Sequence, residues 1–191
     1  MVAKKYYNLD KMVVYAPKHK KTVVFVAHCL LNQYSRAIGV KNCYKEDDIV
    51  PGTVKPLVNL LNKYNVAIVQ MPCPEVFYEG LIRRASGQTR YNTEKYKEVC
   101  RRIAKDIIYL IEQYYKNGYK ILIIGVDGSP SCGVTLTALG GGKWANDRGI
   151  FMRILEEELK KKGYNIPIVG ARLRSPIEIN RFLKDVERQI K

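Results

Sequence analysis

Short apolar runs alternate with longer amphipathic stretches along this chain, and the alternation predicts its secondary structure. Runs rich in Val and Ile are typical of buried strands, and they lie at 22–27, 66–71, 121–124 and 166–171. Apolar residues at helical spacing predict helices at 54–64, 93–114, 151–159 and from 176 onward. Strands that alternate with helices form parallel sheets covered on both faces. We therefore expect a single α/β domain over residues 1–191, a three-layer sandwich with a mainly parallel, Rossmann-like sheet.

Three stretches are expected to lie outside this regular framework. Residues 1–21 are basic and aromatic, and only 12–15 are strand-like, which predicts a basic N-terminal arm or an edge strand. The polar stretch 32–48 predicts a long loop, and a second loop is expected over 74–91. Long loops in compact domains are usually functional. The glycine run 140–142 precedes a predicted helix, but its spacing fits neither the P-loop nor the dinucleotide fingerprint, so we do not expect a phosphate site there.

Three of the five cysteines follow predicted strands. Cys29 comes after the first strand, Cys73 after the second, and Cys132 lies in a loop of Gly, Ser and Pro after the third. Neighbouring parallel strands present their carboxyl ends at one edge of the sheet, where α/β folds bind ligands, so the three thiols are expected to converge. The alternative is that they pack as small buried hydrophobes.

A fourth cysteine, Cys100, lies on the apolar stripe of the helix predicted at 93–114 and is expected in the core. The members of that stripe are Tyr96, Cys100, Ile103, Ile107, Leu110, Ile111 and Tyr114. The fifth, Cys43, follows no strand and has polar neighbours, so we expect a free thiol that binds no cofactor.

The composition of the chain indicates the cellular compartment and suggests a second kind of partner. The chain is 47% hydrophobic, yet no apolar run is long enough to span a bilayer and the start has no apolar signal-peptide core, so we expect a cytoplasmic protein without a membrane partner. Cysteines in that compartment are more often metal ligands or reactive thiols than disulfides. The net charge of +15 suggests nucleic acid, but Lys and Arg are scattered over every segment, so RNA stays open as a partner.

Three motifs in chain order carry a family resemblance. They are His28-Cys29-Leu30-Leu31-Asn32-Gln33, Met71-Pro72-Cys73-Pro74-Glu75 and Gly128-Ser129-Pro130-Ser131-Cys132-Gly133. Over roughly residues 22–171 the chain resembles the thiouracil desulfidase family, and more closely its branch of desulfidases without an assigned substrate. The resemblance implies a [4Fe-4S] cluster held by the thiolates of Cys29, Cys73 and Cys132, with the fourth iron free of protein ligands. The donor chemistry agrees, because soft thiolates suit iron–sulfur clusters or zinc.

The resemblance also implies catalytic residues. A glutamate and a serine of these motifs act in the desulfidases, and the matching positions here are Glu75 and Ser129. Glu75 would activate water or protonate the leaving group, and Ser129 would bind or relay a proton. The alternatives are a loop-bonded glutamate and a turn serine. His28 stands where the desulfidases tend to have a small residue, and it is either a second acid or base or a histidine bonded to nearby backbone.

Three function classes follow from these residues. The first is an iron–sulfur desulfidase that removes sulfur as sulfide, without redox chemistry, from a small thiolated substrate such as a thiouracil-like base or nucleotide. The second is a basic RNA-binding protein with a structural metal or iron–sulfur site, whose binding would depend strongly on salt. The third is a thiol redox enzyme, which ranks last because the chain has no Cys-X-X-Cys pair. The oligomeric state stays open.

Overall fold

The computed structural model describes residues 21–39 and 51–191. The main sheet has four strands, β1 (Thr22–Ala27), β2 (Ala67–Met71), β3 (Lys120–Val126) and β6 (Ile168–Ala171). They pair side by side in the order β2-β1-β3-β6, and every pair is parallel. The central strands β1 and β3 are buried almost throughout, as expected for apolar runs covered on both faces. The four predicted strands are therefore confirmed, and the predicted residues 12–15 and Cys43 lie outside the described ranges.

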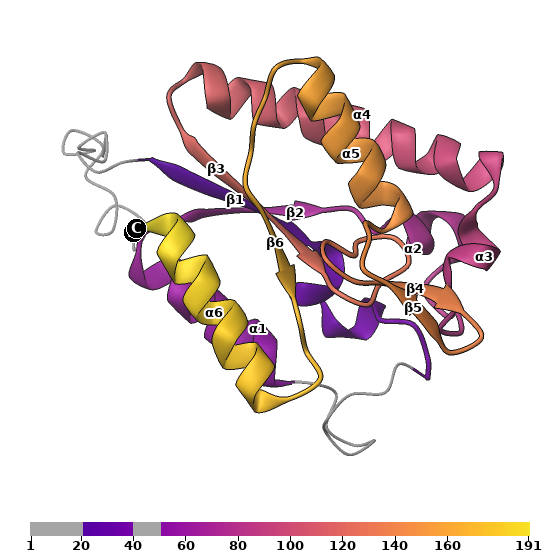
Figure 1. Ribbon diagram of the computed structural model, residues 1–191. Coiled ribbons are helices and arrows are strands. Elements are labelled where there is room, and N and C mark those ends of the chain that lie inside the picture. Colours follow the sequence, from indigo (N-terminus) through magenta and orange to yellow (C-terminus); the bar gives the residue numbers. More distant parts are fainter. Residues whose placement is uncertain (1–20, 40–50) are drawn as a thin grey trace, which may run out of the picture.

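Helices cover both faces of the sheet and complete a Rossmann-like α/β sandwich (Figure 1). On one side lie α1 (Pro51–Lys63) and α6 (Pro176–Ile190), and on the other lie α4 (Glu94–Lys116) and α5 (Ile150–Lys161). The described helices include none that is long and apolar enough to cross a bilayer.

Side-chain caps begin α4 and α6, close to the starts that the sequence predicts for these two helices. The Thr93 hydroxyl accepts from the backbone N–H of Tyr96, and the Ser175 hydroxyl accepts from that of Glu178. Along α4 the predicted stripe is buried, Cys100 included, except that Tyr114 is partly buried and Leu110 is 40% exposed. The buried face of α4 also includes Ala104 and Ile108, which lie one turn apart and are 1% and 4% exposed.

Two regions differ from the sequence prediction. The expected loop after β2 contains two short helices, α2 (Pro74–Glu79) and α3 (Gln88–Tyr91). Pro74 stands at the first position of α2, where its missing N–H costs nothing. The glycine run forms the turn of an antiparallel hairpin, β4 (Thr137–Gly140) and β5 (Lys143–Ala145), instead of leading into a helix. All three glycines have positive φ, between +58° and +113°, which explains why glycine is used there.

Candidate functional site

The strand order brings the three strand-end cysteines to one edge of the sheet. Cys29 lies in a 3-10 turn (His28–Leu30) after β1, Cys73 caps α2 after β2, and Cys132 lies in the loop after β3. Because β1 pairs with both β2 and β3, the carboxyl ends of these three strands are neighbours. All three thiols are free; Cys73 and Cys132 are buried and Cys29 is partly exposed.

The three thiols influence one another electrostatically. Burial raises the pKa of Cys132 well above its usual value, and the negative charges of Cys73 and Cys29 raise it further. Burial and the Glu75 carboxylate raise the pKa of Cys73 to about 11, and Cys29 adds to this shift. Burial likewise raises the pKa of Cys29, against the lowering effect of Arg36. Three thiolates in this position are therefore unfavourable unless a cationic partner compensates them.

These residues fit an iron–sulfur group by their chemistry. The donors are three soft sulfurs on neighbouring strand ends, and their mutual repulsion is the kind that a bound metal centre relieves. Within residues 21–39 and 51–191, however, no group of three or more His, Cys, Asp or Glu side chains is placed to hold a metal ion. The assignment of Cys29, Cys73 and Cys132 as ligands therefore rests on the chemistry of their sulfur donors and on the electrostatic repulsion between their thiolates.

Glu75 lies beside these thiols in a network of hydrogen-bond donors. It is 7% exposed, in the first turn of α2. Its Oε1 accepts from the Ser131 hydroxyl at 2.7 Å and from the Ser129 hydroxyl at 3.4 Å, and its Oε2 accepts from Arg83 Nε at 3.1 Å. This is the pattern of a carboxylate, which accepts at both oxygens and donates at neither.

Ser129 has a second task in the loop that carries Cys132. Its hydroxyl oxygen accepts from the backbone N–H groups of Ser131 and Cys132, at 3.1 and 3.0 Å. The structure thus places Ser129 against Glu75 and also gives it the turn-forming contacts of the alternative interpretation.

Ser131 is closer to Glu75 than Ser129 is, and the sequence interpretation missed it. Its side chain is fully buried, and its hydroxyl lies 2.5 Å from the Tyr96 hydroxyl. Since Ser131 donates to Glu75, Tyr96 must be the donor to Ser131. The signal was available, because Ser131 lies in the same motif, two residues after Ser129.

Arg83 is the second residue that the sequence interpretation missed. It is 7% exposed and reaches Glu75, the Cys73 sulfur and the backbone carbonyl of Ser35. In the sequence it is one of two adjacent arginines in a polar stretch, and no local pattern distinguishes it from Arg84.

His28 is held by a side chain rather than by the backbone. Its Nδ1 lies 2.6 Å from Nε2 of Gln70, the penultimate residue of β2. Gln70 then donates to Nδ1, which leaves the proton of a neutral imidazole on Nε2. Burial, followed by the positive charge of Arg83, lowers the pKa of His28, so the neutral ring prevails at pH 7.

Asp127 organises the loop that follows β3. Its Oδ1 accepts from the backbone N–H groups of Val134, Thr135 and Leu136, and its Oδ2 accepts from the Thr135 hydroxyl and from Arg172. The carboxylate side chain is only 3% exposed. These contacts fold the chain back after Cys132 and fix where the loop re-enters the core.

We expect Asp127→Ala to lower the free energy of unfolding by about 3 kcal/mol, because it leaves several partly buried backbone N–H groups without an acceptor. Burial by itself raises the pKa of Asp127, but hydrogen bonds from Thr135 and the neighbouring backbone outweigh it and hold the pKa below its usual value. The stabilisation is therefore complete above the unfolded-state pKa of about 4 and is lost as pH falls through the lower folded-state pKa. Urea unfolding at pH 7 and at pH 3 measures both effects.

The matched control is Asp185→Ala, which removes a half-exposed carboxylate paired with Arg188 on α6. An exposed pair of this kind is worth about 0.5 kcal/mol or less. Equal losses in the two variants at pH 7 would contradict the role given to Asp127.

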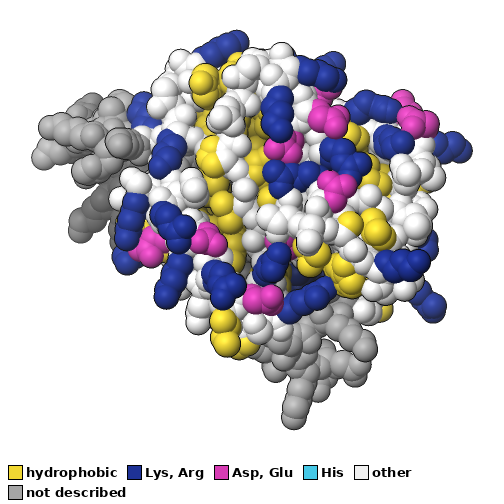
Figure 2. Space-filling view, in the orientation of Figure 1, with side chains coloured by type: hydrophobic (Ala, Val, Ile, Leu, Met, Phe, Trp, Pro, Cys, Tyr) yellow, Lys and Arg dark blue, Asp and Glu magenta, His cyan; other side chains and the backbone are white. Residues whose placement is uncertain are grey.

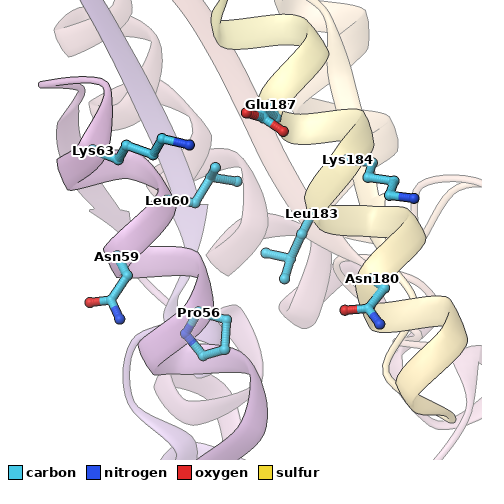
Figure 3. A pocket seen from close by; sticks show the side chains of 8 residues that line it. All are labelled: Pro56, Asn59, Leu60, Lys63, Asn180, Leu183, Lys184 and Glu187. Atoms are coloured by element: carbon cyan, nitrogen blue, oxygen red, sulfur yellow. The ribbon is translucent and has the colours of Figure 1, made fainter.

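The surface shows two other features away from this edge. A groove of about 400 Å³ lies between α1 and α6 (Figure 3). Its lining residues are Pro56, Asn59, Leu60, Lys63, Asn180, Leu183, Lys184 and Glu187. Lys and Arg side chains are spread over the face shown in Figure 2, interspersed with acidic and apolar ones, as the scattered charges of the sequence predict.

Comparisons with known proteins relate most of the chain to one protein family. The family model described as "Putative 2-thiouracil desulfurase" matches residues 21–163, a range that contains the three strand-end cysteines, Glu75 and Ser129. An uncharacterized protein of Methanocaldococcus jannaschii is 29% identical over 171 residues, which cover 90% of this chain and 98% of that protein. No solved structure matches the chain significantly.

Proposed function

Because the chain belongs to the family described as "Putative 2-thiouracil desulfurase", we propose that it removes sulfur from a thiocarbonyl compound by hydrolysis. The carbon–sulfur bond is replaced by a carbon–oxygen bond from water, and sulfur leaves as sulfide with the two protons of that water. No electrons are consumed. The observation that carries the proposal is the position of a buried carboxylate, Glu75, beside three thiols at the ligand-binding edge of the sheet.

In this proposal Cys29, Cys73 and Cys132 hold a [4Fe-4S] cluster. When bound, the cluster supplies an iron that is free of protein ligands and polarises the substrate sulfur as a Lewis acid. The alternatives of a closed zinc site and of a disulfide exchange site have less support. A closed zinc site needs a fourth ligand, and exchange needs an accessible, low-pKa thiol, whereas burial raises the pKa of all three thiols here.

The side chains around the thiols divide the remaining tasks. Glu75 is the general base that takes a proton from the attacking water, since its oxygens accept hydrogen bonds and donate none. Ser129 donates to the same carboxylate and accepts from the backbone of the Cys132 loop, so it positions Glu75 against that loop and can relay a proton from it. His28 presents an Nε2–H donor at the partly exposed end of β1, which suits a hydrogen bond to a carbonyl or ring nitrogen of the substrate.

We expect anaerobically purified protein to contain about four iron and four sulfide per chain and to release sulfide from a thiolated pyrimidine with no added reductant. The assay should include 2-thiouracil, a thiolated nucleotide and RNA that contains thiolated bases, since the roles given to Glu75 and His28 involve the water and the base and not what is attached to the ring. Chromatography of the product should show the corresponding carbonyl compound. Stoichiometric zinc without iron, or an iron-loaded protein inert toward the whole panel, would contradict the proposal.

A further inference from the structure

Arg83 is a buried cation that contacts two residues of the second motif, Cys73 and Glu75, and the backbone that follows the first motif. Its side chain is 4% exposed. Nε donates to Glu75 at 3.1 Å, Nη2 donates to the Cys73 sulfur at 3.7 Å, and Nη1 donates to the Ser35 carbonyl at 2.9 Å. Ser35 lies in the 3-10 turn (Gln33–Ser35) that follows the Cys29 segment, so one guanidinium joins the chain after β1 to the chain after β2.

Packing alone does not account for an arginine at this position. The desolvation of a buried ion pair can cancel its attraction, so replacement by apolar residues is often neutral or stabilising. The contact with Ser35 would suffice to tie the two segments together. The other two branches of the guanidinium are directed at the groups with chemical roles, the carboxylate of Glu75 and the sulfur of Cys73. A planar fork can serve both at fixed angles, which an ammonium cannot do.

We propose that Arg83 is a positioning residue of the desulfidase site, which fixes the Glu75 carboxylate and sets the electron density on the Cys73 sulfur; this inference rests on the proposed function. The Nε contact occupies one carboxylate oxygen and leaves the other to Ser131 and Ser129, so Glu75 has a single orientation. The Nη2 contact withdraws electron density from a cluster ligand.

Each branch has its own measurable consequence. Hydrogen bonds to ligand sulfurs stabilise the reduced form of an iron–sulfur cluster, so loss of the Nη2 donor should make the cluster's reduction potential more negative. Loss of the Nε donor should lower kcat with little change in KM, because a misplaced base affects the chemical step more than substrate binding. A residue that only supported the fold would change stability and leave the potential of an intact cluster where it was.

The test compares Arg83→Gln and Arg83→Lys with Arg84→Gln, a substitution of the adjacent and exposed arginine. Anaerobically reconstituted proteins are matched for iron content, and the potential is measured by spectroelectrochemistry beside kcat and KM for sulfide release. We expect both Arg83 variants to keep the cluster, to show a more negative potential and to lose at least about tenfold in kcat. Arg84→Gln should match wild type in all three quantities.

The outcomes separate this inference from the function on which it rests. Wild type that holds no iron or releases no sulfide overturns the proposed function and, with it, the role of Arg83. Active wild type with Arg83 variants that match Arg84→Gln in potential and kcat overturns the role of Arg83 alone. If Arg83→Gln fails to fold, Arg83→Lys keeps the charge and lacks the fork, and its comparison with Arg84→Gln decides the same question.

Discussion

Single replacement of Cys29, Cys73 or Cys132 by serine is expected to reduce the iron content from about four atoms per chain to less than about one, and to abolish sulfide release. The three residues come from three different strand ends, and each of these segments holds a single cysteine among the residues that the structure describes. A serine oxygen is a hard donor and a poor replacement for a thiolate in an iron–sulfur site. Iron and acid-labile sulfide assays on anaerobically purified variants measure the effect.

Cys100→Ala is the matched control for these three variants. Cys100 is fully buried on α4 and belongs to the hydrophobic core, and burial raises its pKa to about 12. Its replacement should keep the full iron content and cost about 1 kcal/mol in unfolding free energy, as for a small cavity. Full iron content in any one of the three strand-end variants would remove that cysteine from the ligand set, and loss of iron in Cys100→Ala would show that the control residue is part of the site.

The sheet could be predicted because its strands are buried on both faces. A strand in that position is a nearly continuous run of Val, Ile and Leu, as at β1 and β3, and such a run stands out in any window of the sequence. The helix caps at Thr93 and Ser175 are equally local signals. The hairpin of β4 and β5 could not be predicted, because its strands are only four and three residues long and a glycine run ahead of an apolar helix is equally typical of a helix approach.

The site was predictable only where a chemical group follows directly from a strand. Cys29, Cys73 and Cys132 sit at strand ends, and parallel pairing brings them together without further information. Arg83 reaches the site from a segment without a periodic pattern, and its burial depends on contacts with Glu75 and with Ser35, which is 48 residues away in the chain. No window of the sequence contains those partners together. Tertiary contacts alone distinguish Arg83 from the exposed Arg84.

Glu75→Gln is expected to keep the cluster and to lower turnover by about a hundredfold or more, which is the usual loss when a general base is removed. The substitution preserves shape and burial. The amide oxygen can still accept from Ser131 or Arg83, so part of the local hydrogen-bond network remains. What is lost is the negative charge that takes a proton from water. Sulfide release is compared with that of wild type at equal iron content, and Ser129→Ala is expected to show a smaller loss.

Glu79→Gln provides the control for the same chemical change in the same helix. Glu79 ends α2 and is bonded to Arg90 and Tyr91, so the variant removes a paired carboxylate away from the thiols. Its turnover should stay within about twofold of wild type, because substitutions outside a site rarely exceed a few tenths of a kcal/mol in their effect on the reaction. If Glu75→Gln and Glu79→Gln release sulfide at equal rates, Glu75 is not the base. The water would then have to be activated by another group at this edge of the sheet.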